Sequence, residues 1–242
     1  MLTSILEMKR LGMLDAPSVI FMILSFAAMV LVMLPLHEFA HAFVADRLGD
    51  PTPRQNGRLS LNPFHHLDWF GTLMLLTVGF GYARPVPVNP RNFRSKSPQT
   101  GMALTAAAGP VANLLMAAVS LLLFRLIGLL TGESVTLQNG YVYVTSRGIY
   151  YVYLVLVQVF ASVNLGLAVF NLLPIPPLDG SRILMRFLPQ RLQYRVMQYE
   201  QYITIAVFVL LLAGVLDVPL SFLRSGIGWV LCILMGLPNY FG

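Results

Sequence analysis

Long apolar runs separated by short polar stretches are the feature that most constrains this 242-residue chain. Hydrophobic residues make up 57% of the sequence and charged residues only 11%, whereas soluble domains carry about 25% charged residues. Such a chain cannot cover a water-facing surface with polar groups. We therefore predict a single all-α polytopic membrane domain over residues 1–242. A soluble enzyme, a nucleic-acid-binding protein and a disordered protein are excluded, despite the net charge of +6.

The apolar runs predict five to six membrane segments. A helix that crosses the hydrocarbon core needs roughly 20 apolar residues. One run is too short for this and predicts a re-entrant segment, residues 67–80. The other runs are long enough or nearly so, and the last two are closely spaced: residues 18–45, 101–130, 149–173, 202–216 and 220–237.

A polar, proline-rich stretch, residues 50–99, separates the first long run from the next. Residues 58–61 alternate between polar and apolar side chains, and residues 84–90 contain three prolines. Proline restricts itself and the preceding residue to non-helical geometry. The stretch therefore predicts a small β-structure at the membrane surface.

The basic residues indicate how the chain is oriented. Seven of the 16 Lys and Arg residues lie between positions 47 and 96, and four more lie between positions 182 and 195. Both groups fall on one side if the short segment does not cross. The positive-inside rule makes that side cytoplasmic. We expect a multi-pass protein of the cell (inner) membrane.

The first apolar run contains the sequence His37-Glu38-Phe39-Ala40-His41, which is H-E-x-x-H. On a helix, side chains four positions apart lie on one face, so both imidazoles can bind one metal ion. Glu38 lies on the adjoining face, where it can act on water rather than bind the metal. Ionisable residues inside a membrane helix indicate function by default.

Catalytic zinc sites usually have three protein ligands and one open position. The candidate third ligand is Asp179, which follows three prolines at the end of the run 149–173. These prolines must break the helix, and irregular backbone at membrane depth is tolerated where it lines a cavity. The predicted topology brings both motifs to a similar depth on the cytoplasmic side. The alternative is that Asp179 binds no metal and is a turn residue in the pair Asp179-Gly180.

Together the two motifs resemble those of the site-2 protease family of intramembrane zinc metalloproteases, peptidase family M50. The second motif is similar to the family's N-x-x-P-x-x-P-L-D-G, with Asn171, Pro174, Pro177, Leu178, Asp179 and Gly180 in place. The segment 108–113 resembles the family's small-residue segment. The resemblance covers roughly residues 18–185, leaving accessory helices at about 196–242, and the chain resembles a compact form without a PDZ or CBS domain.

The resemblance implies one zinc ion on His37, His41 and Asp179, with Glu38 as the catalytic acid/base. It also implies a three-helix catalytic core and a membrane-anchored protein substrate cleaved in regulated intramembrane proteolysis.

Further candidates rest on the residues themselves. Asn171 and Asn113 are polar residues at membrane depth, suited to hydrogen-bonding an oxyanion or substrate backbone. Interhelical hydrogen bonding is the alternative. Val86 and Val88, in the extended proline-rich segment, are candidates for binding substrate by strand addition. His65, His66 and Asp68 leave a second metal site, a water path or an interfacial loop open.

Two other functions remain as alternatives to proteolysis. An inactive, membrane-embedded binding partner would have no need of Glu38. A zinc transporter or sensor would explain buried His and Asp residues, but transport calls for further polar positions along a path. The sequence does not indicate the oligomeric state.

Overall fold

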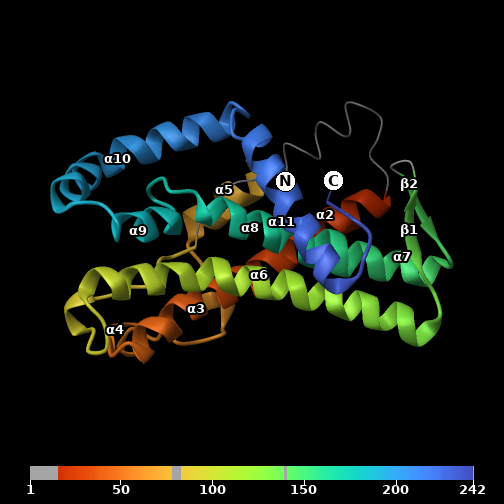
Figure 1. Ribbon diagram of the computed structural model, residues 1–242, viewed down its shortest axis with the longest axis horizontal. Helices are drawn as coiled ribbons and strands as arrows, with labels where there is room; N and C mark the ends of the chain where they lie inside the picture. The colour runs from red at the N-terminus through yellow and green to blue at the C-terminus, as the bar shows by residue number, and fades with distance from the viewer. Residues whose placement is uncertain (1–15, 78–82, 139–140, 242) are drawn as a thin grey trace. The chain divides into compact units, whose positions relative to one another are not determined.

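The computed structural model describes residues 16–77, 83–138 and 141–241 (Figure 1). These residues are mainly helical and contain one two-stranded sheet. The chain divides into two compact units, residues 1–95 and 96–242. Each unit is described by itself below. The prediction of a single domain over residues 1–242 stays a prediction.

The first unit begins with an almost continuous helix and continues as a polar segment with short helical turns. Its elements are α2 (Ala16–Ala28), the π-helical turn η1 (Met29–Met33), α3 (Leu34–Arg47), α4 (Thr52–Gln55), the 3-10 turns η2 (Pro63–His65) and η3 (Pro90–Asn92), and between these turns α5 (Trp69–Thr77). Pro35 has no N–H to bond to the carbonyl of Leu31. The helix adopts its π-helical turn directly before this proline.

The polar segment after α3 is tied together by Asp50, which is fully buried. Its carboxylate accepts hydrogen bonds from the backbone and hydroxyl of Thr52, from the backbone N–H of Asn89 and from the amide of Asn92. Burial raises the pKa of Asp50, but the hydrogen bonds outweigh it and leave the pKa below its ordinary value of 3.8. A charged carboxylate thus holds residues 89–92 against the end of α3.

The second unit is built on one long helix. Its elements are α6 (Pro98–Thr131), β1 (Val135–Gln138), β2 (Tyr141–Val144), α7 (Arg147–Tyr153), the π-helical stretch η4 (Leu154–Ala161), α8 (Ser162–Leu172), α9 (Asp179–Met185), α10 (Gln190–Leu212) and α11 (Asp217–Met235). Helix α6 packs against η4, α8, α9 and α11. The strands form an antiparallel hairpin with Val135 opposite Val144, at the green end of α6 (Figure 1).

The core of this unit lies between α6, η4, α8 and α11. It includes the aromatic cluster Phe124, Tyr153 and Tyr240, in which each ring lies within 6.0 Å of the other two. The half-buried Arg125 joins α6 to the end of α11: its guanidinium donates to the carbonyls of Met235 and Gly236 at 2.5 and 2.6 Å. These bonds satisfy carbonyl groups that the end of a helix leaves unpaired.

Four helices of the described chain are long and apolar enough to cross a membrane: Ile23–Arg47, Pro98–Thr131, Arg147–Leu172 and Asp217–Met235. They correspond to four of the predicted runs and confirm an all-α polytopic membrane protein. Residues 202–212 of the run 202–216 form the end of α10, which is not among the four. The short run contains α5, and its residues 78–80 lie outside the described residues.

The predicted position of the β-structure is wrong. Residues 58–61 and 84–90 form no strand, and the sheet of the described chain is the hairpin at 135–144. The prolines at 85, 87 and 90 explain this in part, because each lacks the N–H that a sheet ladder needs.

Candidate metal centre

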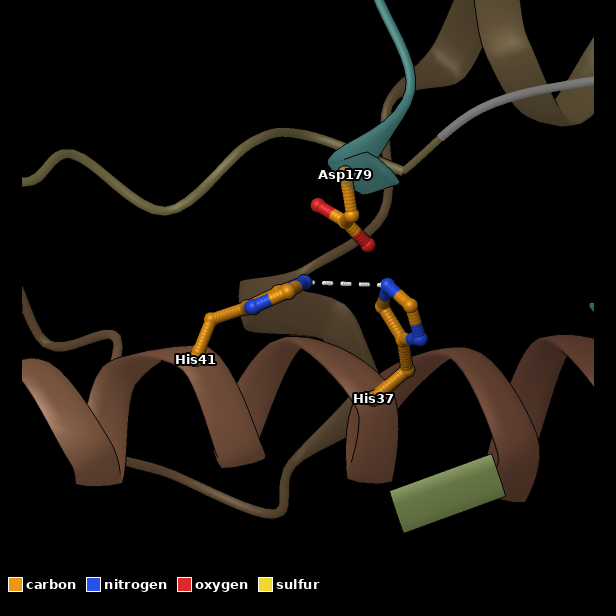
Figure 2. Close-up of side chains that lie close together, drawn as sticks. All are labelled: His37, His41 and Asp179. Atoms are coloured by element: carbon orange, nitrogen blue, oxygen red, sulfur yellow. Dashed lines mark hydrogen bonds between the residues drawn. The ribbon is translucent and has the colours of Figure 1, made fainter. Parts of the chain in front are cut away.

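The two histidines of the H-E-x-x-H sequence lie on one face of α3, as the spacing predicts. Both are buried. Their Nε2 atoms lie 3.0 Å apart, and the rings meet edge to face with centroids 4.6 Å apart. Figure 2 shows the two imidazoles turned toward each other above the helix. Two neutral imidazole nitrogens that converge in this way can share a metal ion.

Glu38 occupies the adjoining face of α3 and is half-buried. Among the described cations, Arg58, from the polar segment of the same unit, interacts electrostatically with Glu38. Burial lowers the pKa of Arg58, the charge of Arg84 lowers it further, and the Glu38 carboxylate opposes both. Glu38 therefore lies within electrostatic range of a buried guanidinium without forming an ion pair with it.

Asp179 lies where the fourth apolar run breaks. Helix α8 ends at Leu172, and the chain makes a proline-rich turn before α9 begins at Asp179. The turn brings the start of α9 against the end of α8. A Cβ atom on Gly180 would collide with the backbone carbonyls of Leu172 and Leu173. Only glycine fits at position 180, so close packing requires the glycine of the Asp-Gly pair.

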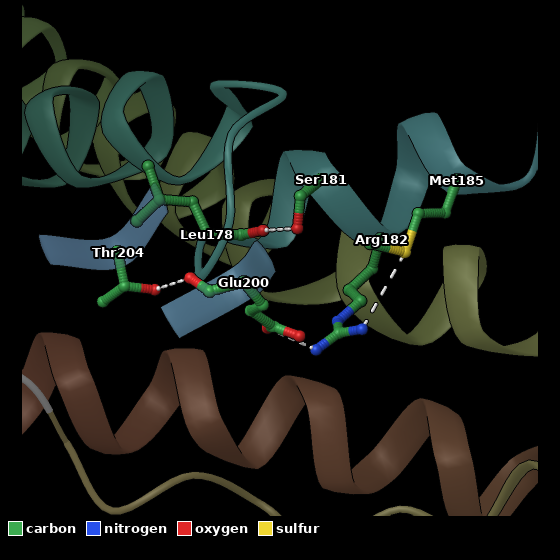
Figure 3. Close-up of polar contacts among 6 residues, drawn as sticks. All are labelled: Leu178, Ser181, Arg182, Met185, Glu200 and Thr204. Atoms are coloured by element: carbon green, nitrogen blue, oxygen red, sulfur yellow. Dashed lines mark hydrogen bonds and ion pairs between the residues drawn. The ribbon is translucent and has the colours of Figure 1, made fainter. Parts of the chain in front are cut away.

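Helix α9 is fixed by polar contacts at both ends (Figure 3). The hydroxyl of Ser181 donates to the carbonyl of Leu178 at 2.6 Å, which closes the first turn. Arg182 forms an ion pair of 2.8 Å with Glu200 of α10. The amide of Gln193, also from α10, donates to the carbonyls of Met185 and Leu188 near the end of α9. The helix that begins with Asp179 is therefore held by α10.

One group of His, Cys, Asp and Glu side chains in the described part of the chain could hold a metal ion. Its members are His37 and His41 of the first unit and Asp179 of the second (Figure 2). Two imidazoles and one carboxylate are a usual donor set for catalytic zinc. With a glutamate next to the first histidine, on apolar helices, they define a membrane metalloprotease of the zinc-dependent class.

Comparison with known proteins gives the family. Residues 25–214 match the profile of peptidase family M50. The "Putative zinc metalloprotease YwhC" of Bacillus subtilis is 40% identical over 181 residues, which cover 75% of this chain and 77% of that protein. The "Putative zinc metalloprotease Rip2" of Mycobacterium tuberculosis is 32% identical over 192 residues, which cover 77% of this chain and 66% of that protein. No solved structure matches the chain.

The chain therefore belongs to peptidase family M50, and the resemblance to the site-2 proteases is confirmed. The profile includes the H-E-x-x-H helix and the Asp179 motif. Membership and the four apolar helices make this protein a membrane zinc metalloprotease.

The two candidate asparagines have different surroundings. Asn113 in α6 is fully buried, and neither its amide nitrogen nor its oxygen has a hydrogen-bond partner among the described residues. Asn171 in α8 is half-buried and donates to the carbonyl of Leu167 at 3.0 Å. One amide proton and the side-chain oxygen of Asn171 remain for another partner.

The remaining candidates do not add a metal ligand. Val86 and Val88 are half-buried in irregular backbone. The ring of His66 donates to the carbonyl of Ser60, that of His65 donates to the carbonyl of Gly57, and Asp68 accepts from the backbone of Gly71. Each of these last three polar groups thus has a local structural role, and together they form no metal group in the described chain.

Sequence reasoning overlooked Arg58, which it used only as one positive charge among many. The structure buries this side chain and brings it near Glu38. An arginine in a polar stretch carries no signal of burial, because arginine is almost always exposed.

Proposed function

We propose that this protein is an intramembrane endopeptidase that hydrolyses peptide bonds within or next to the transmembrane segment of membrane-anchored proteins. The observation that carries the proposal is the position of H-E-x-x-H inside a 25-residue apolar helix, Ile23–Arg47. A catalytic group in such a helix acts at the membrane rather than on soluble peptides. The family and the names of the relatives support a zinc-dependent reaction.

We infer that one zinc ion per chain is held by the Nε2 atoms of His37 and His41 and a carboxylate oxygen of Asp179. The burial of both histidines and the grouping of the three side chains support this assignment. When bound, zinc supplies a Lewis acid that polarises a carbonyl group and acidifies water.

Glu38 is the proton carrier in this proposal. Its carboxylate accepts a proton from the attacking water and donates it to the amine that leaves. Two features of the chain support the role: Glu38 lies one position from a ligand, where it projects beside the metal face, and Arg58 provides a positive charge nearby.

Asn113 and Asn171 are proposed to hydrogen-bond the oxyanion or the substrate backbone. The buried amide of Asn113 supports this, because an amide without a described partner is costly unless a ligand or water satisfies it. The support is weaker for Asn171, whose amide already donates to Leu167.

A transmembrane substrate must unwind locally before its peptide bond is accessible. We propose that the unwound strand lies along residues 86–88, with Val86 and Val88 as contacts. Replacing both valines by proline removes two backbone donors, so cleavage is expected to fall; unchanged rates would remove this docking site. The basic residues support a cytoplasmic active site in a cell membrane. The family supports a role in regulated proteolysis.

Zinc content tests the proposal directly. The detergent-purified protein is expected to contain about one zinc per chain, and Asp179→Ala is expected to lose it or bind it much more weakly. Asp68→Ala is the matched control, because Asp68 is another acid, two positions from His66, and its carboxylate accepts from the backbone N–H of Gly71.

The outcomes separate the alternatives. Zinc lost from Asp179→Ala and kept in Asp68→Ala supports the ligand set. Folded wild-type protein without zinc contradicts the proposal and favours an inactive binding partner. Zinc retained in Asp179→Ala excludes Asp179 as a necessary ligand.

A further inference from the structure

The first unit contains a pocket of about 510 Å³ to which the proposed reaction assigns no ligand. Arg58, Arg84 and His65 are among the residues that line it, and its described lining includes no Asp or Glu residue. The charge of Arg84 acts on that of Arg58, so the surroundings of the pocket are positively charged. Phe64 and the prolines 85 and 87 provide its apolar wall.

Arg58 makes this a preformed site. Its side chain is only 5% exposed. Its Nη1 atom donates to the carbonyl of His65 and, at 3.4 Å, to the carbonyl of Arg84. These bonds fix the guanidinium in the pocket, and an arginine fixed in advance loses little freedom when it binds an anion.

Arg58 and Arg84 form no ion pair with a described acidic residue. The charge of Arg84 disfavours the charge of Arg58, and the Glu38 carboxylate opposes this only in part. His65 donates its Nδ1 proton to Gly57, and its Nε2 atom has no described partner. An anion in the pocket would relieve the repulsion between the two guanidinium groups and accept hydrogen bonds from them.

Aromatic residues next to the pocket indicate which anion it meets. Phe64, in the pocket wall, is 75% exposed, and Trp69, at the start of the apolar helix α5, is 92% exposed. Aromatic side chains of this kind gather where a membrane protein meets the headgroup region. Basic pockets at this depth bind the headgroups of acidic lipids.

We propose that the pocket binds the phosphate group of an anionic phospholipid, with Arg58 and Arg84 as its ligands and Phe64 against the glycerol and upper acyl chain. Soluble inorganic phosphate offers the same oxygens, but it would leave the exposed aromatic side chains without a role. The site would anchor the polar segment that follows the H-E-x-x-H helix to the membrane surface.

The test is lipid binding to the full-length, detergent-purified protein, measured by native mass spectrometry with phosphatidylglycerol and phosphatidylcholine. Arg84→Gln is the variant, because its exposed side chain makes no described hydrogen bond. Arg91→Gln is the control: it removes an exposed positive charge from the same segment but not from the pocket. We expect Arg84→Gln to weaken phosphatidylglycerol binding about tenfold, the effect of losing one charged hydrogen bond, and Arg91→Gln to leave it unchanged.

Each outcome decides the proposal. A preference of the wild-type protein for phosphatidylglycerol that depends on Arg84 alone supports it. Equal binding of both lipids by the wild-type protein overturns it, whether or not the variants fold. An equal loss in both variants also overturns it, by showing a diffuse charge effect. If inorganic phosphate binds in an Arg84-dependent way while phosphatidylglycerol does not, the pocket is a phosphate site and the lipid assignment is wrong.

Discussion

The H-E-x-x-H helix and the Asp179 corner supply the candidate ligands in opposite ways. On α3 the two histidines need only a regular helix, because positions four apart share a face. At the corner, Asp179 depends on several features at once: the helix must end at Leu172, the chain must turn, and α9 must approach α8 closely enough to exclude every residue but Gly180. A local periodicity therefore defines the first region, and packing defines the second.

Each region is also held by polar side-chain contacts, called its polar clamp here, and the two clamps differ in burial. The segment after α3 is held by fully buried Asp50, whereas α9 is held by Arg182 and Glu200, whose side chains are 32% and 28% exposed. A buried hydrogen-bonded carboxylate contributes more to stability than a pair that water can solvate. Four substitutions, taken in order of expected effect, test how these regions differ.

Glu38→Gln is expected to have the largest effect. The amide cannot accept and return a proton, so cleavage of a membrane-anchored reporter should fall by about 100-fold or more. The zinc content should stay as in the wild-type protein, because Glu38 is not a proposed ligand. Glu133→Gln, a change outside the site, is the control. Substantial cleavage by folded Glu38→Gln protein would contradict the role.

Gly180→Ala tests the dependence of the corner on packing. The added methyl group meets two backbone carbonyls, and the strain is expected to cost up to about 3 kcal/mol. Thermal unfolding in detergent measures it. Gly166→Ala in α8 is the matched control, because nothing lies within 4 Å of its new methyl group; it should be neutral or stabilise by about 0.5–1 kcal/mol. Similar behaviour of the two variants would mean that the corner is not tightly packed.

Asp50→Asn tests the buried clamp. The amide NH₂ of the variant would face the backbone N–H of Asn89, and two donors cannot bond to each other. The free energy of unfolding should therefore fall by about 1.5 kcal/mol at neutral pH. The lowered pKa of Asp50 sets the pH dependence: the stability from its ionised form is present above the ordinary value of 3.8 and is lost as the pH falls through the lower folded value. Unfolding measured against pH should therefore show the wild-type and variant curves converging only below about 3.8. A constant difference down to lower pH would contradict this.

Arg182→Ala tests the exposed clamp and should have the smallest effect. An ion pair that water can reach contributes about 0–1 kcal/mol and is screened by salt. The unfolding midpoint should therefore move little, and less still at high salt. A loss as large as that of Asp50→Asn would show that α10 holds α9 more firmly than partial exposure indicates.

Much of the fold could be predicted because membrane helices have a simple signal. Four of the predicted runs match the four helices long and apolar enough to span a membrane, and the fourth run ends beside its prolines as expected. The position of the sheet was wrong, because extended backbone before proline looks the same in a sequence whether or not it has a strand partner. The burial of Arg58 and the pocket around it could not be predicted, because they depend on residues 26 positions apart in the chain.

The sequence by itself determined the class of the protein: apolar runs of membrane length, and two histidines and a glutamate at helical spacing within one of them. These are local properties, set by the hydrophobicity and geometry of a single helix. The tertiary structure alone decided which polar groups are buried, such as Asp50, Arg58 and Asn113. It also decided that Gly180 has no room for a side chain. Burial and close approach are set by the packing of distant segments, and no local pattern of residues encodes them.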